Sequence, residues 1–523
     1  MKMSLCCCAA GRCVLFAAMS ACLPAVVIGA LQEPDWTSLN AESRARSLVQ
    51  VRAGRPGGNP FWNGYAKAFI HPPSFDFREV AEEREYGFTL RPEGGGTSVV
   101  WSAAAPWTPV PTNAWDALPP GYYVLESRAM TMPDFWESRR FYRAAVFKGP
   151  YPAAVRTYRE SARMVYASVF KNPCVKGWLS SKDPPEGYDL YCYPTKIISS
   201  LVRALCRHAF VAPADKDESM DIARRMADWL IAHSQSAGSP LAGFPPTYWG
   251  ERREVSIRNA GQNMLTYPAQ AALAYFDLAK ATGDKRYEVA ALDIAHGYVR
   301  LQEADGTWPL KVRESDGMPV RANRLVPGRY VLGMFDRAFA VTGNRNFADA
   351  GERAFGYVLD NPCVTWNWDG QFEDMEPMPP YRNLQKGNAA DTSIRLFEVG
   401  RVDLAREIVD WCEDQFVVWS DPVHNMDWKH WKTPTALEQY DYYTPIDASM
   451  ADMIGAFTAA YRKTGERLYL EKAKALADNI TRHQRPDGTI PTYFDSRKGS
   501  DWLNCMIYVA DRLEFLADAI DAK

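Results

Sequence analysis

The chain has 523 residues, with 60 Lys and Arg against 63 Asp and Glu and a formal net charge of -3 at pH 7. This length suits one large domain with a smaller one, and the balanced charge gives no indication of a nucleic-acid partner. Aromatic residues make up 13% of the chain, and many fall in expected loops, where a core does not need them.

The first thirty residues have the pattern of a signal peptide. Lys2 precedes an apolar run at 13–28, and small residues at 28–30 offer a cleavage site. The run is short for a membrane span, and no later stretch is long and apolar enough to be one. A lipoprotein cleavage box ending at Cys22 fits less well, because apolar residues continue past it. We therefore expect a secreted or periplasmic protein, with a linker or strap at 31–60.

The cysteines do not form a recognisable framework. Five of the 11 fall in the signal segment, and the other six are scattered without Cys-x-x-Cys spacing. We expect at most one or two disulfides, no structural zinc and no cofactor. Whether a calcium ion takes part stays open, and the sequence does not indicate an oligomeric state.

Residues 61–149 have a strand-like pattern. Short β-branched or aromatic runs are separated by Gly- and Pro-rich turns. This spacing predicts a small antiparallel β-sandwich of immunoglobulin or fibronectin type III character. The expected strands lie at 75–77, 86–90, 97–101, 121–125 and 138–142.

From residue 150 onward the apolar period is helical, which indicates a mainly α domain at 150–523. Twelve helices form six hairpins, and short and long connections alternate between them. In a closed ring, all the long loops would lie on one face, where functional groups commonly collect. The alternative is an open solenoid of hairpins. The number of hairpins, six, and the aromatic loops on a single face both favour the closed ring. The expected helices lie at 153–170, 195–211, 217–235, 262–282, 285–302, 328–342, 346–359, 388–400, 402–416, 446–463, 466–484 and 501–520.

One hairpin pattern recurs three times, with helix, Thr-Gly turn, helix and a loop containing Asp-Gly. Self-similarity at this period indicates stacked supersecondary units. Asp305-Gly306 and Asp487-Gly488 occupy matching places, which favours turn chemistry for these two aspartates. The loop at 366–377 departs from the template by adding further carboxylates.

That loop carries Asp369, Glu373, Asp374 and Glu376 among tryptophans. Glycosidic hydrolysis needs one protonated and one ionised carboxyl group, and aromatic rings raise the pKa of the acid and stack on sugars. The alternative is a solvated acidic loop whose tryptophans only fill space. We expect the general acid to be Asp369, Glu373 or Asp374.

A second acidic and aromatic segment at 438–447 leads into the next helix. Asp447 could cap that helix, or it could be the base that activates water, with Asp441 as the fallback. The two histidines of the preceding loop are a weak metal signal. Basic loops carry Arg313 and Arg324, whose guanidinium groups suit substrate carboxylates.

These features resemble the six-hairpin, (α/α)6-toroid carbohydrate-active enzymes. The group includes glycoside hydrolases, such as the unsaturated glucuronyl hydrolases, and also uronate polysaccharide lyases. The resemblance covers about residues 150–520, and it implies an enzyme that cleaves glycosidic bonds. No single family's catalytic motif is complete in this sequence.

We expect hydrolysis of an acidic oligo- or polysaccharide by a carboxylate pair. The alternative is β-elimination, with Asn263 or Arg324 neutralising a uronate and Tyr330 or Tyr267 moving the proton. A non-catalytic carbohydrate-binding protein is the third hypothesis. The expected substrate-binding residues are Trp366, Trp368, Trp249, Trp308, Tyr248, Tyr193, Tyr267, Arg313, Arg324, His424 and Tyr442.

Overall fold

The chain divides into two compact units, Met1–Asp35 and Trp36–Lys523, and every helix and strand of the described residues lies in the second unit. His424, the expected signal peptide 1–30 and its Cys22 lie outside the described residues. The computed structural model describes residues 35–49, 65–75, 77–132, 134–379, 381–421, 431–497, 499 and 501–522.

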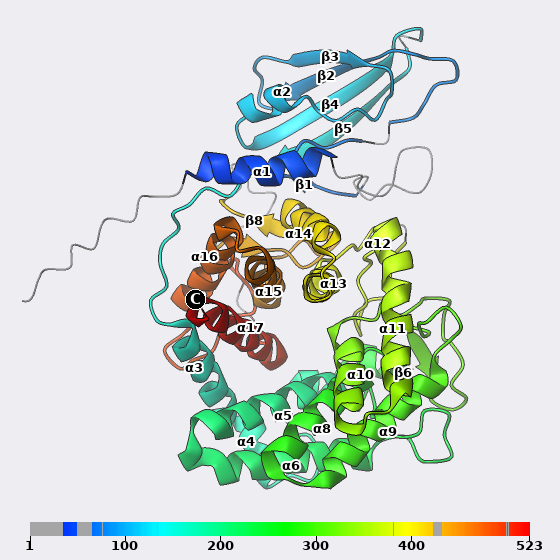
Figure 1. The fold of residues 1–523 in the computed structure, drawn as a ribbon, viewed down its shortest axis with the longest axis vertical. Helices are drawn as coiled ribbons and strands as arrows, with labels where there is room; N and C mark the ends of the chain where they lie inside the picture. Colours follow the sequence, from blue (N-terminus) through cyan, green and yellow to red (C-terminus); the bar gives the residue numbers. More distant parts are fainter. Residues whose placement is uncertain are drawn as a thin grey trace, which may run out of the picture. The chain divides into compact units, whose positions relative to one another are not determined.

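Twelve long helices in the described part of 150–523 alternate between an inner and an outer ring (Figure 1). Each inner helix contacts the next, and α17 contacts α5, so the ring is closed as predicted. The inner helices are α5 (Pro194–Val211), α8 (Pro268–Thr282), α10 (Arg329–Thr342), α13 (Gly387–Glu398), α15 (Asp447–Thr464) and α17 (Leu503–Asp521). The outer helices are α3 (Tyr158–Lys171), α6 (Lys216–Ala232), α9 (Lys285–Leu301), α11 (Arg345–Asp360), α14 (Val402–Phe416) and α16 (Arg467–His483).

The repeated Thr-Gly turns end three inner helices. Gly283, Gly343 and Gly465 each adopt a left-handed conformation, with φ of 74°, 68° and 75°. Glycine takes this conformation without the steric cost of a Cβ atom, so the chain can reverse at once into the outer helix. The repeat therefore specifies the short connections of the ring.

The Asp-Gly loops follow the outer helices. Gln302 donates to the carbonyl oxygen of Gly306 at 2.8 Å, and Gln484 donates to that of Gly488 at 2.9 Å. Asp305 accepts from the backbone amide of Thr307 at 3.2 Å, and Asp487 makes the equivalent bond to Thr489 at 3.0 Å. Both aspartates thus have the turn role that the sequence indicated.

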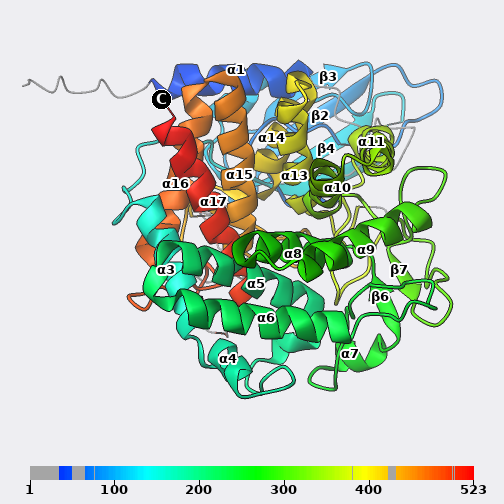
Figure 2. The ribbon, with the colours of Figure 1, turned by 60° about the horizontal axis from the view of Figure 1, so that its bottom comes forward.

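The long loops carry short elements of their own, and β6 pairs with β7 beside α7 (Figure 2). These elements are α4 (Pro173–Lys176), the 3-10 helices at Gly177–Leu179 and Asp189–Cys192, α7 (Glu254–Arg258), β6 (Gln262–Met264), β7 (Lys311–Arg313), α12 (Pro362–Thr365), β8 (Val417–Val418) and β9 (Thr435–Ala436). The short connection between α5 and α6 holds one more 3-10 helix, Pro213–Asp215.

Before the helical ring, the described residues form one five-stranded sheet in the order β1-β5-β4-β2-β3. Strand β1 pairs parallel with β5, and the other pairs are antiparallel. One face is buried, where Phe88, Leu125 and Phe141 pack with Trp115. The elements are α1 (Trp36–Val49), β1 (Ala68–Phe69), β2 (Tyr86–Pro92), β3 (Val99–Ala103), α2 (Thr112–Ala117), β4 (Gly121–Ala129) and β5 (Trp136–Arg143).

The sheet differs from two expectations. Phe75 and Phe77 of the expected strand 75–77 do not lie in a strand and instead fill the core under the sheet. No second sheet faces the first within the described residues, so a sandwich is not formed there. Helix α1 lies within the expected linker or strap at 31–60. The sheet is fixed to the ring by Asp414, whose carboxylate accepts from the amides of Ile70 and His71 at 2.8 Å each.

No helix among the described residues is both long and apolar enough to cross a membrane. The six cysteines of the described part, Cys174, Cys192, Cys206, Cys363, Cys412 and Cys505, all carry free thiols.

Candidate active site

The first turns of all six inner helices line one cavity of about 210 Å³, which we call the front cavity. Since each inner helix follows a long loop, the long loops share this end of the ring, as the alternation of connections predicted. Loop residues Gln371, Phe372 and Glu438 complete the wall. The helix residues include Lys196, Gln270, Arg329, Tyr330, Asn388, Asp391, Ser449, Asp452, Asn504 and Tyr508.

A buried ion pair stands at the edge of the front cavity. Nζ of Lys196 lies 2.5 Å from Oε1 of Glu373, and the other carboxylate oxygen accepts from the hydroxyl of Tyr267. The hydroxyl of Tyr248 donates to the carbonyl oxygen of Glu373 at 2.9 Å. Burial alone would raise the pKa of Glu373, but the charge and hydrogen bond of Lys196 and the hydrogen bond from Tyr267 bring it below its usual value.

The pKa of Lys196 also reflects this pair. Burial disfavours the ammonium, yet the adjacent Glu373 carboxylate raises the Lys196 pKa above its usual value. Both groups are therefore charged at neutral pH, and both oxygens of Glu373 are occupied. Glu373 holds Lys196 and Tyr267 in place and is not free to donate a proton.

Glu438 faces the same cavity and has a different environment. Burial raises its pKa to about 7, against the opposing effect of Lys386 and with a further increase from the charge of Asp374. Its backbone is fixed by a hydrogen bond from its amide to the carbonyl of Thr444 at 2.9 Å. A carboxyl group with this pKa is half protonated at neutral pH, which suits a general acid.

Lys386 and Asp452 lie beside Glu438. Nζ of Lys386 donates to Oγ of Ser449 at 2.5 Å and to the Glu438 carbonyl at 3.4 Å, and lies 3.5 Å from Oδ2 of Asp452. The hydroxyl of Tyr508 donates to Oδ1 of Asp452 at 2.8 Å. These contacts suit a charged carboxylate. Burial lowers the pKa of Lys386.

Arginines close the far end of the front cavity. Asp391 lies 3.0 Å from Arg512 and 3.5 Å from Arg329. The Arg329 guanidinium also donates to the hydroxyl of Tyr330 at 2.5 Å. This network fixes the floor of the cavity and leaves Arg329 and Tyr330 along its wall.

The carboxylates of loop 366–377 are divided among three places. Asp369 lies in a separate outer hollow of about 410 Å³, where burial raises its pKa to about 6. Asp374 lies in a rim hollow of about 440 Å³, near the Lys311–Glu376 ion pair. Asp374 is open to solvent, but surrounding protein and the charge of Glu373 raise its pKa.

The expected base Asp447 is wrongly placed for that role. Its side chain is fully buried and does not line the front cavity. One oxygen accepts from the amide of Ala448 at 2.7 Å, at the start of α15. Asp441 is exposed and lies 3.4 Å from Arg382, also away from the cavity. The bend between Glu438 and Asp447 directs only Glu438 inward.

Three expected sugar-stacking tryptophans belong to the hydrophobic core. Trp308 and Trp368 are 0% exposed and Trp366 is 2% exposed, so their rings are not available to a ligand. Trp249 is 37% exposed and packs edge-on against Trp229. It does not line the front cavity.

Several polar candidates have structural partners. Asn263 is fully buried and bonds Pro245 and Thr247 across the loop before α8. Arg313 is exposed and pairs with Asp316 at 2.8 Å. Arg324 pairs with Glu303 and Asp305 and borders the outer hollow.

The tyrosines are placed more favourably. Tyr267 and Tyr330 line the front cavity. Tyr193 and Tyr248 are buried together near Glu373, whose charge adds to the effect of burial in raising the pKa of both. Tyr442 lies apart from them, with its hydroxyl 3.3 Å from Arg497.

The sequence reasoning missed the charged residues of the inner helices. These are Lys196, Lys386, Asp391 and Asp452, each within the first two turns or the cap of its helix. In a closed ring of hairpins, the first turns of the inner helices meet near the ring axis. A charged residue in the first turns of an inner helix could therefore have been recognised from the sequence as a candidate site residue. Within the described residues, no group of three or more His, Cys, Asp or Glu side chains is arranged to hold a metal ion.

No protein-family model matches this chain, and no curated protein sequence matches it significantly. Solved structures do match. The cellobiose 2-epimerase of Spirochaeta thermophila DSM 6192 aligns with a TM-score of 0.51 and 14% identity, over 70% of this chain and 98% of that one. A D-mannose isomerase aligns with a TM-score of 0.50 and 14% identity, over 71% of this chain and 100% of that one.

The helical region is a six-hairpin toroid. An unsaturated glucuronyl hydrolase specific for heparin also aligns, with a TM-score of 0.45 and 9% identity, over 70% of this chain and 98% of that one. The similar structures are six-hairpin, glycosidase-like proteins, so the resemblance found in the sequence is confirmed for the fold. Identities this low show the toroid alone, and the reaction must be argued from the cavity.

Proposed function

We propose that this protein is an exported enzyme that hydrolyses glycosidic bonds in a saccharide bearing acidic sugars. The observation that carries the proposal is Glu438, a carboxyl group with a pKa of about 7 inside the front cavity. We assign the signal peptide to 1–30, the linker to 31–60, the β domain to 61–149 and the catalytic domain to 150–523.

Glu438 would act as the general acid. In its protonated form it donates a proton to the glycosidic oxygen as the bond from that oxygen to the anomeric carbon breaks. A second carboxylate removes a proton from water while the water oxygen bonds to the anomeric carbon. One water is consumed. The proton from Glu438 ends on the oxygen of the leaving sugar, and the proton from water ends on the second carboxylate. The enzyme returns to its starting state when that carboxylate releases its proton and Glu438 takes one up.

Asp452 is the second carboxylate that we assign. It lines the same cavity as Glu438, and its contacts with Tyr508 and Lys386 suit the charged form. Asp374 lies in the rim hollow beyond the Lys196–Glu373 pair, so its part is to raise the pKa of Glu438. Two carboxyl groups with different environments in one cavity are the arrangement that hydrolysis requires.

The charge of the cavity supports an acidic sugar. Lys196, Lys386 and Arg329 line it together with Asp391, Asp452 and Glu438. Glu373 is paired with Lys196, and Arg512 is paired with Asp391. When Glu438 is protonated, the four cations of this set outnumber the three carboxylates of Glu373, Asp391 and Asp452, which favours a negatively charged substrate. The rings of Phe372 and Trp502 supply apolar surface for a sugar face.

A panel of neutral and uronate-bearing oligosaccharides tests the proposal. We expect release of reducing ends from a uronate-bearing member, and loss of that release in Glu438→Gln. Unchanged activity of Glu438→Gln would contradict the assignment. If neither bond cleavage nor unsaturated product forms with any member, a non-catalytic carbohydrate-binding protein is favoured.

A lyase reaction is the second candidate, and the contact between Arg329 and Tyr330 favours it. An arginine can neutralise a uronate carboxylate, and a tyrosine beside it can carry the proton removed in β-elimination. This reaction creates a carbon–carbon double bond whose ultraviolet absorbance hydrolysis does not produce. Cleavage accompanied by that absorbance would replace the hydrolytic assignment.

A further inference from the structure

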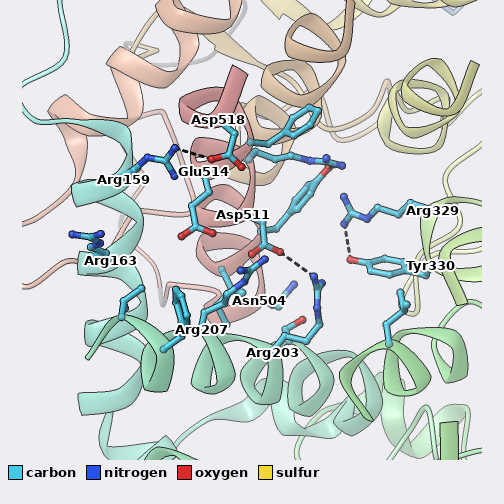
Figure 3. Close-up of a pocket in the computed structure, with 18 residues that line it drawn as sticks. Arg159, Arg163, Arg203, Arg207, Arg329, Tyr330, Asn504, Asp511, Glu514 and Asp518 are labelled. Carbon is cyan, nitrogen blue, oxygen red and sulfur yellow. Dashed lines mark hydrogen bonds and ion pairs between the residues drawn. The ribbon is translucent and has the colours of Figure 1, made fainter. Parts of the chain in front are cut away.

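A second cavity of about 560 Å³ opens at the opposite end of the ring from the front cavity. Its mouth is formed by the last turns of α5 and α17 and the first turns of α3, where the inner helices end. Figure 3 shows the side chains that surround this back cavity. Its deep end shares Ser200, Arg329, Tyr330, Asn504 and Tyr508 with the front cavity.

The lining of the back cavity is rich in arginine. Six arginines line it, against the three carboxylates of Asp511, Glu514 and Asp518. Four of the arginines have acidic partners. Arg159 lies 2.8 Å from Asp518, Arg203 lies 3.2 Å from Asp277, Arg329 lies 3.5 Å from Asp391, and Arg512 lies 3.0 Å from Asp391.

Arg163 and Arg207 differ from these four. Among the described residues, neither guanidinium has an ion pair or a hydrogen bond, although they come from adjacent helices and face the same cavity. Glu514 is the neighbouring carboxylate, and burial raises its pKa against the opposing charge of Arg207, while the hydroxyl of Tyr166 lies 3.2 Å from it. Both arginines are exposed to solvent. Because no carboxylate contacts either guanidinium among the described residues, both can donate hydrogen bonds to an anion that enters the hollow.

The mouth of the back cavity also has apolar surface. The ring of Phe210 is 81% exposed, and Val211 and Phe515 line the same wall. A large exposed aromatic ring beside unpaired guanidinium groups can pack against the apolar body of a ligand while the arginines hold its charged group.

We propose that the back cavity binds a small organic anion through Arg163 and Arg207. The ligand carries a carboxylate, sulfate or phosphate group, which accepts hydrogen bonds from both guanidinium forks, and a ring that packs on Phe210. Asp511 and Asp518 are offset by Arg203 and Arg159, so Glu514 is the carboxylate that opposes binding. This site does not depend on the reaction at Glu438.

Calorimetric titration of the whole protein with inorganic sulfate, inorganic phosphate, glucuronate and glucose tests the site. We expect binding of at least one anion and none of glucose, with glucuronate favoured over the inorganic ions if the ring contact contributes. The double variant Arg163→Gln/Arg207→Gln should weaken anion binding at least about tenfold, the loss expected for charge-assisted hydrogen bonds. Glu514→Gln should strengthen it, because the opposing charge is gone.

The matched control is Arg225→Gln/Arg345→Gln. It removes the same two charges from α6 and α11, where both arginines are exposed and lie outside the cavity. This control should bind the anion like the unmodified protein. No anion binding at millimolar concentration, or equal binding by the Arg163/Arg207 variant and its control, would overturn the proposal.

Discussion

The ammonium nitrogen of Lys196 and the carboxylate of Glu373 meet at 2.5 Å, joining the first turn of α5 to the loop between α11 and α13. The Lys196 side chain is 23% exposed and that of Glu373 is 6% exposed, so the pair is largely withdrawn from water. Through this contact, the loop that carries most of the sequence-predicted carboxylates is anchored beside the front cavity.

Glu373→Gln should destabilise the protein by about 3 kcal/mol, because it leaves the buried Lys196 without its counter-charge. Chemical denaturation measures this. Lys196→Met in the same chain should recover part of the loss, since the uncompensated charge is then removed. Equal stability of Glu373→Gln and the unmodified protein would show that the pair does not hold the loop.

The same pair gives a dependence of stability on pH. The pKa of Glu373 in the folded protein lies below its ordinary 4.5, so the unfolded chain binds the proton more tightly. The contribution of the pair is therefore present above pH 4.5 and is lost as the pH falls below it. Glu373→Gln should have a flatter stability profile than the unmodified protein on this acid side, measured by denaturation at several pH values.

Lys386→Met should shift the basic limb of the activity profile to higher pH. Lys386 opposes the increase in the pKa of Glu438, so its removal stabilises the protonated acid over a wider range. The pH dependence of kcat/KM with the saccharide identified in the panel measures the shift. A limb that stays in place or moves to lower pH would contradict the proximity of the two groups.

Asp369→Asn should retain activity within about threefold, because Asp369 lies in the outer hollow rather than in the front cavity. It is a matched control for Glu438→Gln, since both changes turn a buried carboxyl group of raised pKa into an amide. Initial rates on the same saccharide compare them. Loss of activity in Asp369→Asn alone would move the active site to the outer hollow.

Gly306→Ala and Gly488→Ala should destabilise the toroid more than Gly283→Ala. All three glycines have φ between 74° and 91°, where a Cβ atom costs about 1–2 kcal/mol. At Gly306 and Gly488 that atom would also overlap the backbone carbonyl of Arg353 or Met164, whereas nothing lies within 4 Å at Gly283. Thermal unfolding of the three variants compares the costs, and equal shifts would contradict the close packing of the Asp-Gly loops.

The toroid was predictable because its signals are local. The apolar period, the Thr-Gly turns and the alternating connection lengths lie within single hairpins, and twelve helices lie where they were expected. The expected helix at 262–282 begins only at Pro268, because Gln262–Met264 pairs with β7 as strand β6. The sandwich was not predictable in the same way. Segment 75–77 has the aromatic pattern of a strand, but Phe75 and Phe77 pack under the sheet without joining it.

The site was only partly predictable, because it depends on contacts between distant segments. Lys196 is buried only because Glu373 arrives from a loop that lies far along the chain. The segment 438–447 contains three carboxylates. Which of them faces the front cavity depends on a bend of the backbone in which Tyr443 has a φ of 31°. The sequence pattern of loop 366–377 is the same for tryptophans that stack on sugars and for tryptophans that fill the core, so it could not distinguish the two roles.

The pH dependence of kcat/KM for the unmodified protein and Glu438→Gln, on one uronate-bearing saccharide, is the most direct test of the proposed chemistry. A general acid with a pKa of about 7 predicts activity that falls as the pH rises through 7. In Glu438→Gln, this limb should be absent and kcat/KM should be lower by about 10²–10⁴-fold. A variant that keeps both the rate and the basic limb would contradict the assignment of Glu438 as the proton donor.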